Sequence, residues 1–155
     1  MIEVRQGTLN DVDAAVEVVR QSITQLCVED HHNDEATVNT WLANKTAENF
    51  QIWITNRENF FAVAERGRRL SGVGLLHSSG EIRLFYVAPG VQRQGIGKAI
   101  HAALEDKAKC WGLQTLHLES TALACRFYET FGYHAMAVAK PRFGVLQAYR
   151  YKKTL

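Results

Sequence analysis

The chain has 155 residues, long enough for one domain with a buried core, and a formal net charge of only +2. Hydrophobic residues make up 46% and charged residues 22%, which is typical of globular proteins, and the weak charge favours neither nucleic acid nor an anionic membrane as a partner. No apolar run is long enough to span a bilayer, and the N-terminal residues lack the pattern of a signal peptide. We expect a single cytoplasmic domain over residues 1–155, whose cysteines (Cys27, Cys110 and Cys125) are free thiols.

The first third of the chain predicts a short strand followed by helices. The strand is expected over residues 2–5, and Thr8–Asp11 provides a helix start. Apolar residues then recur at steps of three and four, which indicates an amphipathic helix of about five turns. These residues are Val12, Val16, Val19, Ile23 and Leu26. A polar elbow follows at Cys27–Asp34, and further helices are expected around residues 38–42 and, after a Thr46 cap, around 50–54.

The middle of the chain predicts an antiparallel meander. Strand-like segments cover residues 60–65, 70–77 and 81–88, and the turns between them have the sequences ArgGlyArgArg and SerSerGly. A glycine-containing turn then leads into a helix. The apolar face of this helix includes Ile100, Leu104 and Trp111, and Gly112 follows as the C-terminal cap of the helix.

The last third predicts one more strand, one more helix and a final hairpin. In order these are a strand over 113–119, a helix over 121–131 closed by Gly132, and a hairpin of residues 134–139 and 145–152. The order of strands and helices along the whole chain predicts an α+β fold, in which helices pack on a mixed sheet.

The turn GlnArgGlnGlyIleGly at residues 92–97 has the properties of an anion-binding loop. Glycines let the backbone approach a phosphate closely, and free N–H groups at the start of a helix point toward it. Arg93 and Lys98 add positive charge beside this turn. A glycine-rich turn that only starts a helix is the alternative interpretation.

Two other phosphate-binding motifs do not fit this turn. A Walker loop needs glycine at the position of Gln92 and Ser or Thr at the position of Ala99. A dinucleotide-binding fingerprint needs a third glycine at the position of Ile100. Both motifs are therefore excluded.

Two segments together resemble the GCN5-related N-acetyltransferase (GNAT) family. Residues 92–97 match its Q/R-x-x-G-x-G/A pattern, and AlaCysArgPheTyrGluThrPheGlyTyr at 124–133 is similar to its A-x-x-F-Y-E-x-x-G-F segment. The resemblance implies a mixed, largely antiparallel sheet of about six to seven strands with helices on both faces. It also implies acetyl-CoA-dependent transfer of an acetyl group to a primary amine by direct attack in a ternary complex, without a metal.

The resemblance also implies roles for particular residues. Tyr128 corresponds to the tyrosine near the coenzyme A sulfur, and a phenol with a pKa of about 10 can protonate the leaving thiolate. Taken alone, Tyr128 is more simply interpreted as a half-buried helix tyrosine anchored by its hydroxyl, and the two motifs together favour the catalytic role instead. The strand before the turn should line the path of the acetyl group and offer backbone N–H groups to the oxyanion, although its aromatic residues could also be ordinary core.

The residues expected to bind coenzyme A follow from this comparison. They are Phe85, Tyr86, Val87, Gln92, Arg93, Gln94, Gly95, Ile96, Gly97, Lys98 and Thr121. Thr121 departs from the family pattern, because many relatives carry Asn at this position. Its contact with the cofactor is therefore left open.

The general base has more than one candidate. Glu81 lies where some histone-type relatives carry a glutamate that acts through water, but it also fits an exposed turn. His117 and Glu119 alternate on the following strand and should share a face. Either could join a water relay, although pairing with each other or with neighbouring side chains is the simpler interpretation.

The polar elbow is the expected place of the acceptor amine. Asp30 could hold a cationic amine, and the imidazole of His31 could accept its proton. The spacing of Cys27, His31 and His32 is poor for a metal site, so no metal is expected. The alternative is a polar loop in which Asp34 caps the next helix.

The acceptor itself is left open among a polyamine, an amino acid, an aminoglycoside-like molecule and a protein amine. A non-catalytic acyl-CoA-binding regulatory module is the alternative function, as is an acyltransferase that uses another acyl chain or nucleophile. The family resemblance further suggests a homodimer, formed through an edge at residues 145–151. No nucleic acid or membrane partner is expected.

Overall fold

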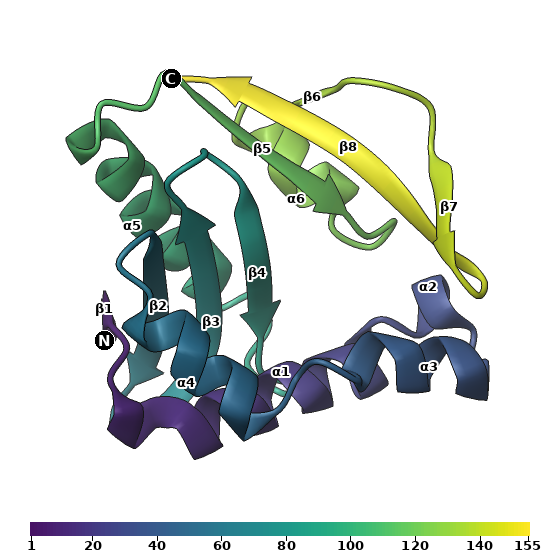
Figure 1. Ribbon diagram of the computed structural model, residues 1–155, viewed down its shortest axis with the longest axis horizontal. Helices are drawn as coiled ribbons and strands as arrows, with labels where there is room; N and C mark the ends of the chain where they lie inside the picture. Colours follow the sequence, from purple (N-terminus) through teal and green to yellow (C-terminus); the bar gives the residue numbers. More distant parts are fainter.

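The computed structural model describes all 155 residues and contains eight strands and six α-helices (Figure 1). The elements are, in chain order, β1 (Ile2–Gln6), a 3-10 turn (Leu9–Asp11), α1 (Val12–Leu26), α2 (Val28–His31), α3 (Glu35–Leu42), α4 (Ala47–Thr55), β2 (Asn59–Arg66), β3 (Arg69–His77), β4 (Ile82–Val87), α5 (Ile96–Cys110), β5 (Thr115–Ser120), α6 (Cys125–Thr130), β6 (His134–Ala135), β7 (Lys140–Phe143) and β8 (Leu146–Thr154). None of the helices is both long and apolar enough to cross a membrane.

The strands form two antiparallel sheets that separate between β4 and β5. The first sheet has the order β1-β2-β3-β4, and the second has the order β5-β8-β6, with β7 also paired to β8. A single parallel bridge between Glu81 and His117 joins the two sheets at one end. Beyond this bridge β4 and β5 move apart (Figure 1). The predicted α+β fold with a mixed, largely antiparallel arrangement is confirmed.

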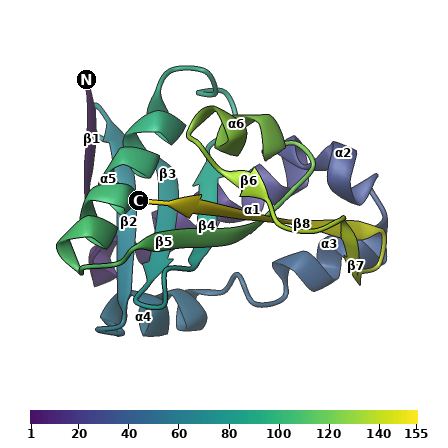
Figure 2. The ribbon, with the colours of Figure 1, turned by 90° about the horizontal axis from the view of Figure 1, so that it is seen from above.

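Helices cover both faces of the sheets, so that there are two cores. The first core packs α1, α3 and α4 against β2, β3 and β4. The second packs α5 and α6 against the opposite face and against β5 and β8. Figure 2 shows α5 and α6 on one side of the strands and α3 and α4 on the other. As a result β4 faces one core with Phe85 and the other with Tyr86.

Two glycines of β3 allow α5 to lie directly on the sheet. A Cβ atom at Gly74 would stand 2.6 Å from Cγ2 of Ile100, and one at Gly72 would stand 2.6 Å from Cδ1 of the same residue. These distances are too short for real carbon contacts, so only glycine permits this packing. The packing fixes the position of α5 and of the glycine turn that precedes it.

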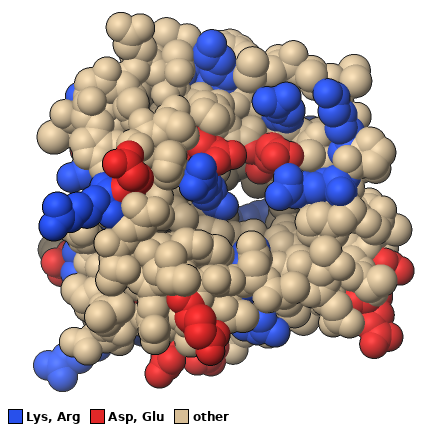
Figure 3. Space-filling view, in the orientation of Figure 1, with Lys and Arg blue, Asp and Glu red and all other residues tan.

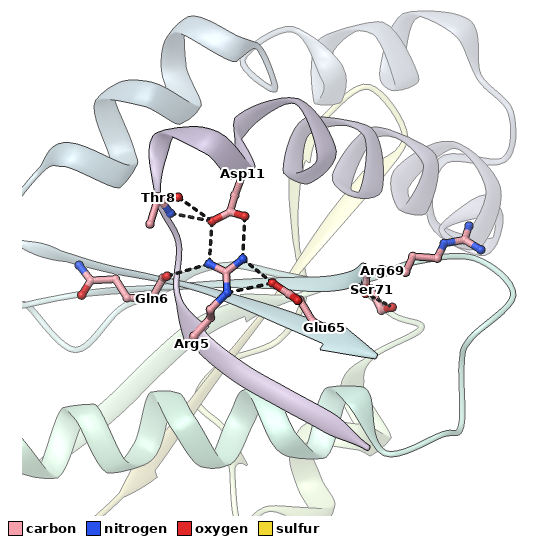
Figure 4. Close-up of polar contacts among 7 residues, drawn as sticks. All are labelled: Arg5, Gln6, Thr8, Asp11, Glu65, Arg69 and Ser71. Carbon is pink, nitrogen blue, oxygen red and sulfur yellow. Dashed lines mark hydrogen bonds and ion pairs between the residues drawn. The ribbon is translucent and has the colours of Figure 1, made fainter. Parts of the chain in front are cut away.

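An ion-pair cluster ties the first helix to the sheet (Figure 4). The guanidinium of Arg5 donates two hydrogen bonds of 2.8 Å to the carboxylate of Asp11 and one of 2.8 Å, through Nε, to Glu65. Asp11 also accepts a 2.7 Å hydrogen bond from the Thr8 N–H. These contacts, chiefly the hydrogen bonds from Arg5, lower the pKa of Asp11 to about 2.

Several helix boundaries follow from capping residues visible in the sequence. The Asp34 carboxylate accepts a 3.1 Å hydrogen bond from the Thr37 N–H at the start of α3. The Thr46 hydroxyl accepts one of 3.3 Å from the Asn49 N–H at the start of α4. The predicted caps at Asp34 and Thr46 are therefore confirmed.

Three local predictions need correction. The polar elbow contains the short helix α2. The predicted helix over 121–131 is limited to Cys125–Thr130, because Thr121 begins a turn in which its hydroxyl accepts a 3.2 Å hydrogen bond from the Ala124 N–H. The last hairpin joins β8 to β7 rather than to residues 134–139 alone. Since β8 lies between β5 and the two strands β6 and β7, residues 145–151 do not form a free edge.

Candidate functional site

The gap between β4 and β5 opens into a cavity of about 470 Å³ on the side of α5 and α6. It lies between β4, the glycine turn, the start of α5, the end of β5 and α6. All of the residues expected to bind coenzyme A line it except Gln94, whose side chain is exposed outside it. The lining ones are Phe85, Tyr86, Val87, Gln92, Arg93, Gly95, Ile96, Gly97, Lys98 and Thr121.

The glycine turn presents free backbone N–H groups to this cavity. Gly95 is the N-cap of α5 with φ of 88°, a left-handed conformation that favours glycine. The first backbone hydrogen bond of the helix runs from Ala99 to Gly95, so the N–H groups of residues 96–98 have no acceptor in the protein. Together with the dipole of the 15-residue helix, these N–H groups favour an anion.

Side chains hold the glycine turn in place. The Gln92 side chain accepts a 2.7 Å hydrogen bond from the Gly90 N–H, and Arg93 adopts a left-handed φ of 62°.

A Cβ atom at Gly97 would lie 3.1 Å from the ring of Phe127 and 3.7 Å from that of Phe85. The absence of a side chain at Gly97 therefore lets the start of α5 lie against the aromatic wall of the cavity.

The free edge of β4 supplies further N–H groups. Ala88 donates its N–H to Ser71 across the pair of β3 and β4. In an antiparallel ladder successive N–H groups alternate in direction, so those of Phe85 and Val87 point away from β3 and toward the gap. They can donate hydrogen bonds to an oxygen that gains negative charge.

Tyr128 stands at the inner wall of the same cavity. It is 4% exposed, and its ring makes edge contacts with Phe85 (centroids 5.7 Å apart) and Tyr133 (5.4 Å). Its hydroxyl makes no hydrogen bond to the protein. Burial raises the pKa of the phenol above its usual value, and the neighbouring phenols add to this effect. Tyr128 is therefore protonated at neutral pH and has a proton to donate.

A second cavity, of about 460 Å³, lies on the opposite side of β4, toward α3, α4 and the hairpin of β7 and β8. Figure 3 shows this face of the molecule hollowed near its centre, with acidic and basic side chains around the opening. The two cavities meet between β4 and β5. The residues that line both are Ile82, Arg83, Leu84, Tyr86, Glu119, Ser120 and Thr121. Two molecules bound from opposite sides could thus touch in the gap.

Glu81 lies on the side of the second cavity. Its carboxylate accepts a 2.6 Å hydrogen bond from Nε of Arg83, and its side chain is 34% exposed. Glu119 also lines the second cavity and accepts hydrogen bonds of 2.9 and 3.1 Å from Arg142. His117 takes part in the bridge beside Glu81. The candidate bases therefore gather where the two sheets meet.

The structure does not bring Asp30 and His31 to either cavity. His31 is fully buried, and its ring nitrogens bond to the Ile23 carbonyl (2.9 Å) and the Asn33 N–H (3.0 Å). Asp30 is 5% exposed and accepts a 2.6 Å hydrogen bond from the Ala122 N–H. Burial raises the pKa of the Asp30 carboxyl. Both ring nitrogens of His31 have protein partners, whereas the second carboxylate oxygen of Asp30 is buried without one. Neither residue lines either cavity, so the predicted contact with the acceptor is corrected.

Several residues that line the two cavities were not predicted from the sequence. Phe127 comes from the recognised motif but received no role. Lys45, Asn59 and Arg142 reach the second cavity from three separate segments. Apart from the motif, no local pattern marks these positions, because only the tertiary fold brings them together.

The chain is similar to known proteins over most of its length. The family model described as "Acetyltransferase (GNAT) domain" matches residues 27–155. Similar solved structures include a GCN5-related N-acetyltransferase from Rhodopseudomonas palustris (21% identity, 99% of this chain and 95% of that one covered, TM-score 0.87). They also include the PaiA N-acetyltransferase from Thermoplasma acidophilum in complex with coenzyme A (20% identity, 100% and 99% covered, TM-score 0.82). No curated protein matches the sequence significantly.

Proposed function

Because the chain belongs to the GNAT family of acetyltransferases, we propose that it transfers an acetyl group from acetyl-CoA to a primary amine by direct attack in a ternary complex. The observation that carries this proposal is the meeting of two cavities between β4 and β5, one beside the glycine turn and one on the opposite side. In the proposal the enzyme works in the reducing cytoplasm, where its three cysteines remain free thiols.

The first cavity suits acetyl-CoA as the co-substrate. The free N–H groups of residues 96–98 would hold the pyrophosphate, with Arg93 and Lys98 adding positive charge. The apolar wall along β4 and α6 would cover the pantetheine chain. Thr121 lines the cavity although its hydroxyl already accepts a hydrogen bond from Ala124.

The chemical step would use groups from both sides of the gap. The N–H groups of Phe85 and Val87 would stabilise the negative charge that develops on the thioester oxygen. Tyr128 would donate its proton to the sulfur as the carbon–sulfur bond breaks. Glu81, held by Arg83, would accept the proton of the amine through water.

A thiol-release assay tests this function. The purified protein is incubated with acetyl-CoA and a panel of primary amines, and free coenzyme A is measured with a thiol reagent. We expect release that depends on an amine and yields an equal amount of the N-acetyl product. Tight binding of acetyl-CoA without any amine-dependent release would instead indicate a non-catalytic acyl-CoA-binding module. Repeating the assay with longer acyl-CoA esters tests the acyl chain preference.

A further inference from the structure

The second cavity has an unusual set of charges. Three cationic side chains, Lys45, Arg83 and Arg142, line it together with two carboxylates, Glu81 and Glu119. Arg83 pairs with Glu81 at 2.6 Å, and Arg142 pairs with Glu119 at 2.9 Å. After these two pairs are counted, the positive charge of Lys45 is left over.

Lys45 is a buried cation without a counter-ion. It is only 8% exposed and forms no ion pair. Its ammonium donates to the side-chain oxygen of Asn44 (2.6 Å) and to the Trp41 carbonyl (3.3 Å), both of which are neutral. An ammonium has three N–H donors, so one is left for a ligand. Burial, and to a lesser extent the charge of Arg142, lowers the pKa of Lys45 to about 8, and the group is still mostly protonated at neutral pH.

A second polar side chain with an atom that lacks a hydrogen-bond partner, Asn59, lines the same cavity. Asn59 is 7% exposed, and its amide nitrogen donates a 3.2 Å hydrogen bond to the Trp53 carbonyl. Its side-chain oxygen is buried and has no partner. Buried polar groups without partners are uncommon and costly, and this oxygen is one of two such side-chain atoms in the protein, the other being Oδ2 of Asp30.

We propose that the acceptor is an amine that also carries a carboxylate, and that Lys45 and Arg142 bind this carboxylate in the second cavity. The inference rests on the proposed function and narrows its substrate class. An anionic group would supply the counter-ion that Lys45 lacks, and a charge-assisted hydrogen bond to it would be strong in a buried site. Tyr86 stands where this cavity meets the first one, so the amine end of the molecule would face the acetyl group.

The same charges disfavour polycationic acceptors. A polyamine or an aminoglycoside would bring further positive charge beside Lys45 and Arg142, and like charges repel more strongly where water is excluded. An α-amino acid or a similar zwitterion instead presents one negative and one positive end. A cavity of about 460 Å³ is within the range of small-molecule sites.

The test compares matched amines in the thiol-release assay. Each of the common L-amino acids is assayed beside its carboxamide, which keeps the amine and removes the negative charge, and spermidine is included as a polycation. We expect at least one amino acid to have a kcat/KM about tenfold or more above that of its amide and above that of spermidine. Equal or better turnover of the amides or of spermidine would overturn the inference and leave the proposed function intact.

A substitution of Lys45 tests whether this residue causes the preference for the amino acid over its amide. Lys45→Met removes the charge and keeps the length of the side chain. It should raise the KM for the preferred amino acid about tenfold and abolish the preference over the amide, while leaving the KM for acetyl-CoA unchanged. Lys109→Met, which removes an exposed lysine of α5, is the matched control and should change neither constant.

Two further results would contradict the proposed role of Lys45. If Lys45 serves only as a cap for the end of α3, Lys45→Met will lower the melting temperature but keep the preference for acid over amide, and this result contradicts the inference. Because the comparison of acids with amides uses the wild-type protein, it stands even if the variant does not fold. Binding of acetyl-CoA with no turnover of any amine would contradict both the inference and the proposed function.

Discussion

Tyr128 is the residue whose proposed chemistry can be tested most directly. Replacing it with Phe removes the hydroxyl and keeps the ring contacts with Phe85 and Tyr133. We expect kcat to fall about a hundredfold, because general acid catalysis contributes at least this much, while the Kd for acetyl-CoA stays nearly constant. Steady-state thiol release and calorimetry measure the two effects. Tyr133→Phe, outside both cavities, is the matched control, and full turnover by Tyr128→Phe would contradict the leaving-group role.

His101 makes stability depend on pH. It is 1% exposed, and its Nε2 lies 2.9 Å from the hydroxyl of Tyr133. Burial, partly offset by Glu105, lowers the pKa of His101 to about 4, whereas an unfolded histidine has a pKa of about 6.5. As the pH falls, His101 therefore becomes protonated in the unfolded state before it does in the folded state. The free energy of unfolding should be fully retained above pH 6.5 and should fall by about 3 kcal/mol as the pH decreases to 4.

Denaturant unfolding between pH 7 and pH 4 measures this effect. His101→Gln cannot titrate in this range, so its free energy of unfolding should depend less on pH than that of the wild type. His134→Gln, at an exposed histidine, should keep the wild-type dependence. Identical slopes for the wild type and His101→Gln would show that His101 is not responsible.

At the scale of single elements, the start of α5 depends on the contact between Gly97 and Phe127. A valine at Gly97 would press against the rings of Phe127 and Phe85 and cover the free N–H groups. We expect Gly97→Val to raise the Kd for acetyl-CoA about tenfold or more, because this backbone is where the phosphates should lie. Ala102→Val, on the exposed face of the same helix, controls for the cost of a β-branched residue. Unchanged affinity of Gly97→Val would place the cofactor elsewhere.

Local patterns predicted most of the elements because the causes were local. The three- and four-residue spacing of apolar residues predicted α1, and Asp34 and Thr46 indicated the starts of α3 and α4. Where a cause was not local, the prediction failed. The turn at Thr121 depends on a hydroxyl contact, and the pairing of β7 with β8 cannot be read from the alternation of residues 145–152.

At the scale of the whole molecule, the two cavities exist only because the two sheets separate. The motifs at residues 92–97 and 124–133 predicted much of the lining of the first cavity, since each motif is continuous in the sequence. The opposite side combines Lys45, Asn59 and Arg142 from three segments, and no spacing rule connects them. His31 was misassigned for the same reason, because a histidine in a polar segment gives no sign that the fold will bury it.

The homodimer stays a prediction. The strand expected to provide its edge, β8, is paired on both sides, so a dimer would have to use another surface. Sedimentation equilibrium at micromolar concentration measures the oligomeric state, and a monomer there would contradict the expectation.

The most direct measurement is a calorimetric titration of the purified protein with acetyl-CoA, with dephospho-CoA and desulfo-CoA as comparators. We predict one site per chain, whose Kd for acetyl-CoA rises about tenfold or more in Gly97→Val and is unchanged in Ala102→Val and in Lys45→Met. Desulfo-CoA should bind nearly as well, because in the proposed binding mode the loop holds the phosphates. No binding of acetyl-CoA would mean that residues 92–97 only start a helix, and it would contradict the acetyltransferase function proposed for this chain.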